Sequence, residues 1–124
     1  MSSVVFILRY CLVWCSWNRR KVLRGYIKTR LQELLQEKAK LLNLDIEDLI
    51  ILPDQVHVSI IQKSPVDTPH HYCSQFKAYS SSILRKEFAG LLKMPTLWTR
   101  NYCCVPNLNE YLKVVNKFVK EQKD

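Results

Sequence analysis

Glycine and proline are scarce in this sequence of 124 residues, which contains two glycines and five prolines. No linker, low-complexity tract or internal repeat is visible. Hydrophobic residues make up 48% of the chain and charged residues 24%, which is the composition of an ordinary folded domain. We therefore expect a single domain over residues 1–124, because the chain is too short for a two-domain enzyme.

Long apolar runs and paired metal-binding motifs are also missing. The apolar stretch Val4–Leu8 ends at Arg9, far short of the about 20 residues that span a bilayer, and no small-residue cleavage pattern follows it. The five cysteines show no Cys-x-x-Cys spacing, which argues against a zinc site and against a disulfide framework. The sequence thus predicts a soluble, cytoplasmic protein with reduced cysteines.

Acidic residues are absent from the first thirty positions, although the whole chain carries 19 Lys and Arg against 11 Asp and Glu, a net charge of +8. Such a basic cluster favours a polyanionic partner, either nucleic acid or an anionic membrane surface. A solvated face that only keeps the protein soluble is the alternative interpretation. Trp17 lies within the cluster and suits base stacking, with packing under a helix as its alternative. The basic residues are Arg9, Arg19, Arg20, Lys21, Arg24, Lys28 and Arg30.

Hydrophobic periodicity predicts seven elements in the order strand, helix, strand, strand, helix, strand, helix. The expected ranges are a strand over 4–15, a helix over 21–42, a strand hairpin over 46–52 and 55–61, a loop over 62–72, a helix over 74–92, a strand over 97–105 and a helix over about 108–122. This order is typical of an α+β ferredoxin-like β-α-β-β-α-β sandwich, in which two helices cover one face of a four-stranded antiparallel sheet. The C-terminal helix is an addition that can cover the other face.

The third predicted strand separates polar from apolar side chains. Gln55 and His57 alternate with valines, so we expect them on the face away from the two central helices, where the last helix can pack. At 3.6 residues per turn, Tyr111, Phe118 and Gln122 fall on one side of that last helix. Gln122 is therefore placed to reach the strand.

Five short stretches, taken in order along the chain, carry a family resemblance. They are Leu12-Val13-Trp14 with Asn18-Arg19-Arg20-Lys21-Val22-Leu23, Leu52-Pro53-Asp54-Gln55-Val56-His57-Val58, Phe76-Lys77, Leu97-Trp98-Thr99-Arg100-Asn101-Tyr102 and Phe118-Val119-Lys120-Glu121-Gln122. Over nearly its whole length the chain resembles the single-tyrosine HUH transposases, which mobilise insertion sequences through single-stranded DNA, and their relatives associated with repetitive palindromes.

The resemblance implies a metal site and a nucleophile. In the family, a His-hydrophobic-His motif and a Gln of the last helix hold one Mg²⁺ or Mn²⁺, and a Tyr one turn before that Gln attacks the scissile phosphate to give a 5′-phosphotyrosine. Here Gln55, His57 and Gln122 match the metal positions and Phe118 matches the nucleophile, so the first His and the Tyr are replaced. A phenyl ring has no oxygen to attack phosphorus. The residues expected to contact DNA are Trp17, Arg19, Arg20, Lys21, Arg24 and Arg100.

Two functions follow from this pattern. The first is a cleavage-defective relative that binds single-stranded or hairpin DNA as a homodimer. The second is an active transposase with a substitute nucleophile such as Tyr111, which lies two helical turns, or about 11 Å, before Phe118. RNA binding through the open sheet face follows from the fold alone, although the aromatic signature of RNA-recognition motifs is absent.

Overall fold

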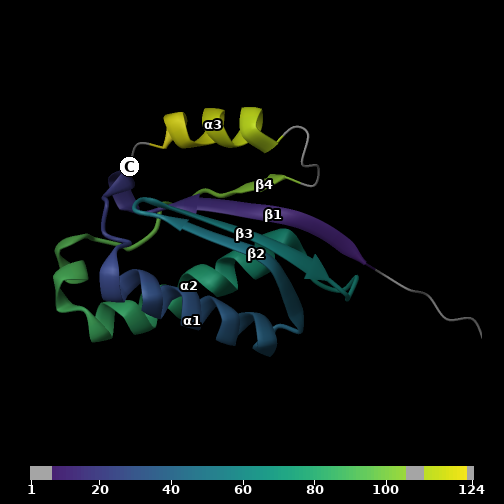
Figure 1. Ribbon diagram of the computed structural model, residues 1–124, viewed down its shortest axis with the longest axis horizontal. Coiled ribbons are helices and arrows are strands. Elements are labelled where there is room, and N and C mark those ends of the chain that lie inside the picture. Colours follow the sequence, from purple (N-terminus) through teal and green to yellow (C-terminus); the bar gives the residue numbers. More distant parts are fainter. Residues whose placement is uncertain (1–6, 106–110, 123–124) are drawn as a thin grey trace, which may run out of the picture.

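The computed structural model describes residues 7–105 and 111–122, and it places a four-stranded antiparallel sheet between two layers of helices (Figure 1). The strand order is β2-β3-β1-β4, with α1 and α2 on one face and α3 on the other. The elements are β1 (Leu8–Cys15), η1 (Trp17–Arg19), α1 (Gly25–Leu41), β2 (Leu44–Leu52), β3 (Gln55–Gln62), α2 (Pro69–Glu87), η2 (Ala89–Lys93), β4 (Cys103–Val105) and α3 (Tyr111–Glu121). This arrangement confirms the ferredoxin-like α+β fold with an added C-terminal helix.

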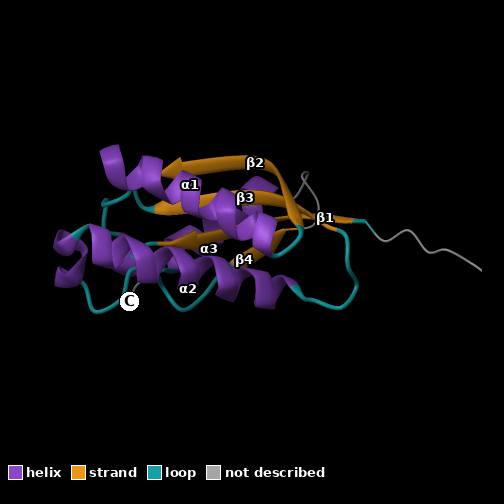
Figure 2. Cartoon of the chain, turned by 90° about the horizontal axis from the view of Figure 1, so that it is seen from below, coloured by secondary structure: helices purple, strands orange, loops and turns teal. Residues whose placement is uncertain are grey.

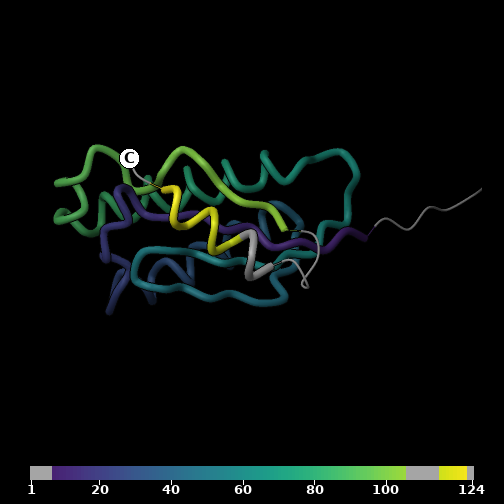
Figure 3. The backbone as a smooth tube through the Cα atoms, turned by 90° about the horizontal axis from the view of Figure 1, so that it is seen from above, coloured from purple at the N-terminus to yellow at the C-terminus, as the bar shows by residue number. Residues whose placement is uncertain are grey.

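The two faces of the sheet are covered to different extents. α1 and α2 lie side by side under the sheet (Figure 2), whereas α3 lies across β1 and β4 (Figure 3). None of the helices in the described ranges combines the length and the apolar composition that crossing a membrane requires. Positions 4–6 of the predicted first strand and 108–110 of the predicted last helix lie outside the described residues.

The first helix begins at Gly25 rather than at position 21. The backbone N–H of buried Leu23 donates to the carbonyl of Pro53 at 2.9 Å, which holds the preceding segment against the β2–β3 hairpin. Gly25 then has a φ of 56°, in the left-handed region where glycine is favoured. As a result Lys21 and Arg24 lie in the connection between β1 and α1 instead of on a helix.

The second helix begins at Pro69, so the predicted loop over 62–72 is too long. The Thr68 hydroxyl accepts the N–H of His71 at 3.2 Å and caps the helix, and Pro69 occupies the first turn, where its missing N–H costs nothing. The helix ends at Glu87 because Phe88 takes an extended conformation, and the short helix η2 replaces the last turn that was predicted to reach position 92.

The fourth strand is much shorter than the predicted 97–105. Its ladder with β1 covers only Cys103–Val105, and Trp98 makes an isolated bridge near the end of β1. Between them, the Lys77 ammonium donates to the carbonyls of Thr99 at 2.5 Å and of Asn101 at 3.4 Å. The carbonyls of this segment thus bond to α2, while the N–H of Thr99 still donates to the carbonyl of Cys15 at the end of β1.

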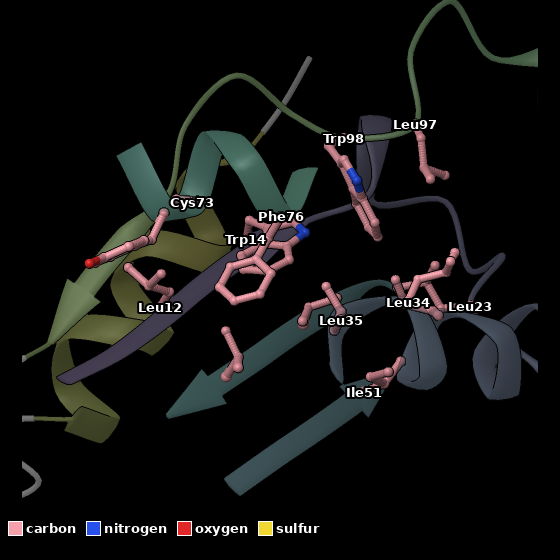
Figure 4. Packing of buried hydrophobic residues seen from close by; sticks show 14 of the residues in the cluster. Leu12, Trp14, Leu23, Leu34, Leu35, Ile51, Cys73, Phe76, Leu97 and Trp98 are labelled. Atoms are coloured by element: carbon pink, nitrogen blue, oxygen red, sulfur yellow. The ribbon is translucent and has the colours of Figure 1, made fainter. Parts of the chain in front are cut away.

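β1 divides the core into two clusters because its side chains alternate between the faces. Leu12 and Trp14 face α1 and α2, where the Trp14 ring stacks on Phe76 with centroids 6.3 Å apart and meets the edge of Trp98 at 5.9 Å (Figure 4). The second cluster lies between the sheet and α3. It is made of Cys11, Val13, Cys15, Cys103 and Val105 from the strands and of Val115 and Val119 from α3.

Candidate functional site

Gln55 and His57 lie on the face of the sheet that α3 partly covers. Half-buried and buried residues alternate along β3, as predicted. In the antiparallel register Gln55 is opposite Cys15, and His57 is opposite Val13. Because directly opposed residues share a face, the two polar side chains border the apolar cluster beneath α3.

A hydrogen bond joins the two polar side chains. His57 Nε2 lies 2.8 Å from Gln55 Oε1, and since an amide oxygen only accepts, the imidazole donates from a protonated Nε2. Burial lowers the pKa of His57 below its ordinary value of 6.5, while the negative charge of Asp54 opposes that shift. At neutral pH the site therefore contains a neutral imidazole paired with a carboxamide.

The lowered pKa of His57 predicts that the protein loses stability as the pH falls below about 6.5. In this range the unfolded chain, where histidine has a pKa of about 6.5, binds more protons than the folded chain and is favoured. We expect the free energy of unfolding, measured by urea denaturation between about pH 8 and pH 5, to decline more in the wild type than in His57→Gln. An equal decline in both proteins contradicts the burial of a neutral imidazole.

The C-terminal end of α3 carries the other two predicted site positions. Gln122 directly follows the helix and is buried, with Nε2 donating to the carbonyl of Phe118 at 3.4 Å. Its Oε1 is also buried and has no hydrogen-bond partner among the described residues. An unpaired buried acceptor costs about 1–3 kcal/mol, so this oxygen is suited to a ligand that supplies positive charge or a donor. The half-buried ring of Phe118 packs against the cluster beneath α3.

The structure joins Gln55 and His57 by a hydrogen bond and places Gln122 at the end of α3, and the donor types of these three residues match a hard divalent cation in kind. Two amide oxygens and an imidazole nitrogen are ligands that Mg²⁺ and Mn²⁺ accept, and the unpaired Gln122 Oε1 is an acceptor that such an ion satisfies. Two features weaken the match. His57 and Gln55 already bind each other, and within residues 7–105 and 111–122 no three His, Cys, Asp or Glu side chains gather as a metal site.

Asp54 is a site residue that the sequence analysis did not single out. Its buried carboxylate directly precedes Gln55 and accepts from Arg19 Nε, with 3.1 Å between Nε and Oδ2. Asn18 and Arg19 have φ values of 52° and 50°, a left-handed turn that brings the guanidinium back to the β2–β3 hairpin. Its sequence signals were a position in the turn before Gln55 and membership of one of the stretches that carry the family resemblance. The guanidinium of Arg19 is therefore bound to Asp54 and holds this turn in place.

Three other predicted cations are exposed at the end of β1 and before α1. Arg20, Lys21 and Arg24 are solvent-exposed, and none of them forms an ion pair with another residue of the described chain. The guanidinium of Arg20 lies over the ring of Trp17, 5.6 Å from its centroid. Arg100 is exposed in the segment before β4. These side chains are free to contact the phosphates of an external partner.

Fold and site together define a small α+β domain with a polar pair on its central sheet, a helix over the same face and a basic segment at one end. This is the architecture of the single-tyrosine HUH transposases that the sequence resembles. Residues 4–122 match the family model described as IS200-like transposase. The chain belongs to this family, as the sequence resemblance predicted.

Individual relatives agree with the family assignment. The ISDra2 transposase TnpA of Deinococcus radiodurans is 25% identical over 127 residues, which cover 97% of this chain and 87% of the relative. A crystal structure from Deinococcus radiodurans R1, provisionally described as a transposase, superposes with a TM-score of 0.90 at 23% identity and covers 99% of this chain and 96% of its own. A REP-associated tyrosine transposase bound to a REP hairpin superposes with a TM-score of 0.58 at 13% identity, covering 97% and 72%. The two solved structures support the fold.

Proposed function

We propose that this chain is a member of the IS200-like transposase family that binds single-stranded or hairpin DNA and does not cleave it. The observation that carries the proposal is Phe118, which lies one helical turn before Gln122 at the position where the family resemblance implies the nucleophilic tyrosine. Because phenylalanine has no hydroxyl, this position cannot form a phosphotyrosine bond.

The alternative nucleophile is poorly placed on the same helix. Tyr111 is the first residue of α3, and it lies seven positions before Phe118. At 1.5 Å per residue this is a displacement of about 10.5 Å along the axis. A reacting oxygen has to approach the phosphorus to about 3–3.5 Å. An active site that uses Tyr111 therefore requires α3 to slide by about two turns along the sheet, which would carry Gln122 away with it, so we favour the cleavage-defective function.

A metal ion, where it binds, would be held by His57 and by the amide oxygens of Gln55 and Gln122. A divalent cation supplies a Lewis acid that polarises a phosphate. Around such a phosphate, the half-buried imidazole of His57 is kept neutral, and the Arg19–Asp54 ion pair holds the turn that directly precedes Gln55. Since the His57–Gln55 hydrogen bond must open first, we propose that Mg²⁺ or Mn²⁺ binds weakly without DNA.

Hairpin or single-stranded DNA is the partner that the surface fits. Arg20, Lys21 and Arg24 present positive charge that no described carboxylate neutralises, next to the aromatic ring of Trp17. Phosphates and unpaired bases are bound by such combinations of cations and aromatic rings. A structural relative is bound to a REP hairpin, which supports the same class of partner here.

Binding to a pool of fluorescent DNA hairpins with randomised loops and flanks tests the partner directly. Fluorescence anisotropy is expected to show binding that weakens steeply as the salt concentration rises, and that exceeds binding to a blunt duplex of the same length. Binding that is equally strong for the blunt duplex, or insensitive to salt, overturns hairpin recognition. The cleavage part of the proposal is tested separately by the search for a covalent complex.

We also propose that two copies of the chain form a homodimer through sheet edges. β2 is an edge strand of nine residues. Its side chains Ile50 and Leu52 lie on the same face as α3, beyond the part that α3 covers, and they remain 46% and 40% exposed. A long edge strand with exposed apolar residues is a template for pairing with another strand. Sedimentation equilibrium is expected to give twice the chain mass for the wild type and the single mass for Leu52→Lys. A monomeric wild type at about 100 μM contradicts the dimer.

A further inference from the structure

A cavity of about 460 Å³ lies at the end of the sheet where β1 ends. Its lining residues are Trp17, Pro95, Thr96, Trp98 and Arg100. The backbone on the two sides is held together, because the N–H of Trp17 donates to the carbonyl of Leu97 at 2.8 Å and the N–H of Thr99 donates to the carbonyl of Cys15 at 3.0 Å. The cavity is thus part of the folded framework, and its volume falls within the range of about 300–1,000 Å³ that is typical of small-ligand sites.

The walls of the cavity combine aromatic surface with a cationic rim. Trp98 is fixed in the core, because its Nε1 donates to Ser80 Oγ at 3.1 Å and its ring meets Trp14 edge-on. Trp17 is only half-buried. Arg100 is exposed at the rim, and it makes no ion pair within the described part of the chain. A flat aromatic surface next to an unpaired guanidinium fits a planar base attached to a phosphate.

The cavity also lies at the same end of the sheet as the polar pair on β3. Cys15, the last residue of β1, is directly opposite Gln55, and Trp17 follows only two residues later. At about 3.3 Å per residue, the chain from Cys15 to Trp17 spans at most roughly 7 Å. Trp17 and Trp98 pack with the cluster that faces α1 and α2, so a DNA strand that reaches both the polar pair and the cavity has to round this end of the sheet.

We propose that this cavity binds one unpaired base of single-stranded DNA, stacked on Trp17, with an adjacent phosphate held by Arg100. The proposal rests on the proposed DNA binding and adds a specific ligand site to it. A base in a duplex is already stacked on its neighbours and is not available to the cavity. The site thus selects DNA that has a single-stranded segment next to the hairpin stem.

If the Trp17 ring stacks on one base, removing the ring and removing that base have effects on affinity that are not additive, which can be measured. The probe is the strongest-binding hairpin of the randomised pool, in which each single-stranded position is replaced in turn by an abasic nucleotide. At one position the replacement is expected to weaken binding to the wild type at least about fivefold, and to have no further effect in Trp17→Ala. Tyr26→Ala is the matched control, because Tyr26 is 87% exposed on α1 and lines no part of the cavity.

Two further variants keep the proposal testable whatever the stability of Trp17→Ala. Trp17→Phe retains a stacking ring and is expected to retain the abasic effect, while Arg100→Gln is expected to reduce the slope of log K against log salt by about 0.7. If the wild type binds hairpins and every abasic replacement weakens binding equally in the wild type and in Trp17→Ala, the base site in the cavity is contradicted while hairpin binding stands. Absence of wild-type binding to every hairpin overturns both proposals.

Discussion

The double variant Gln55→His, Phe118→Tyr is expected to form a covalent complex with DNA that the wild type does not form. Phe118 already packs against the cluster that contains Val13, the residue directly opposite His57, so a tyrosine at position 118 adds its hydroxyl on the correct face of the sheet. A histidine at position 55 restores an imidazole where a carboxamide now binds His57. The variant thus combines a nucleophile with a stronger metal site.

The experiment uses the hairpin pool labelled at its 3′ ends, because a 5′-phosphotyrosine retains the downstream fragment. In the presence of Mn²⁺, denaturing electrophoresis is expected to show a labelled protein band for the double variant, and the band disappears when EDTA is present. Gln55→His alone is the matched control, since it repairs the metal position without adding a nucleophile. A double variant that binds the hairpins and yields no band shows that positions other than 55 and 118 also block cleavage.

Removal of two cations from the segment before α1 is expected to cause the largest loss of DNA affinity. Lys21 and Arg24 are exposed and carry no ion pair within the described residues. Two lost phosphate contacts lower the salt slope by about 1.4–1.8, which corresponds to a roughly 25- to 60-fold loss of affinity at about 0.1 M salt. Anisotropy titrations of Lys21→Gln, Arg24→Gln at several salt concentrations measure both quantities.

The matched control removes two lysines from the opposite end of α1. Lys38 and Lys40 lie in its last turn, and Lys40 is about 15 residues, or roughly 22 Å, from Gly25 along the helix axis. The variant Lys38→Gln, Lys40→Gln changes the net charge by the same amount and is expected to bind DNA within a few-fold of the wild type. Equal losses in the two double variants indicate that overall charge, and not a DNA-binding segment, controls affinity.

Much of the fold follows from local pattern. The alternation in β3 and the helical periodicity of α1 survive in the structure because each element buries one continuous apolar face. The boundaries that differ are set by single contacts between distant residues. Leu23 is held by Pro53, and Lys77 binds the carbonyls of Thr99 and Asn101. Periodicity contains no information on such partners, so the helix start and the strand length were wrong.

The candidate site was predictable only in part for a similar reason. Strand alternation placed Gln55 and His57 on one face, and the structure agrees. Their mutual hydrogen bond and the Arg19–Asp54 ion pair depend on a left-handed turn and a hairpin that meet only in the folded chain. The prediction for the side chain of Tyr111 lies outside the described residues.

The wild-type chain itself provides the most direct test of its function. The same 3′-labelled hairpin pool, incubated with the wild type and Mn²⁺, is divided between native and denaturing electrophoresis. Our proposal predicts a salt-sensitive complex in the native gel and no labelled protein in the denaturing gel, because Phe118 has no oxygen to bond to phosphorus. A labelled band that survives denaturation in the wild type and disappears in Tyr111→Phe contradicts the proposal and identifies an active transposase.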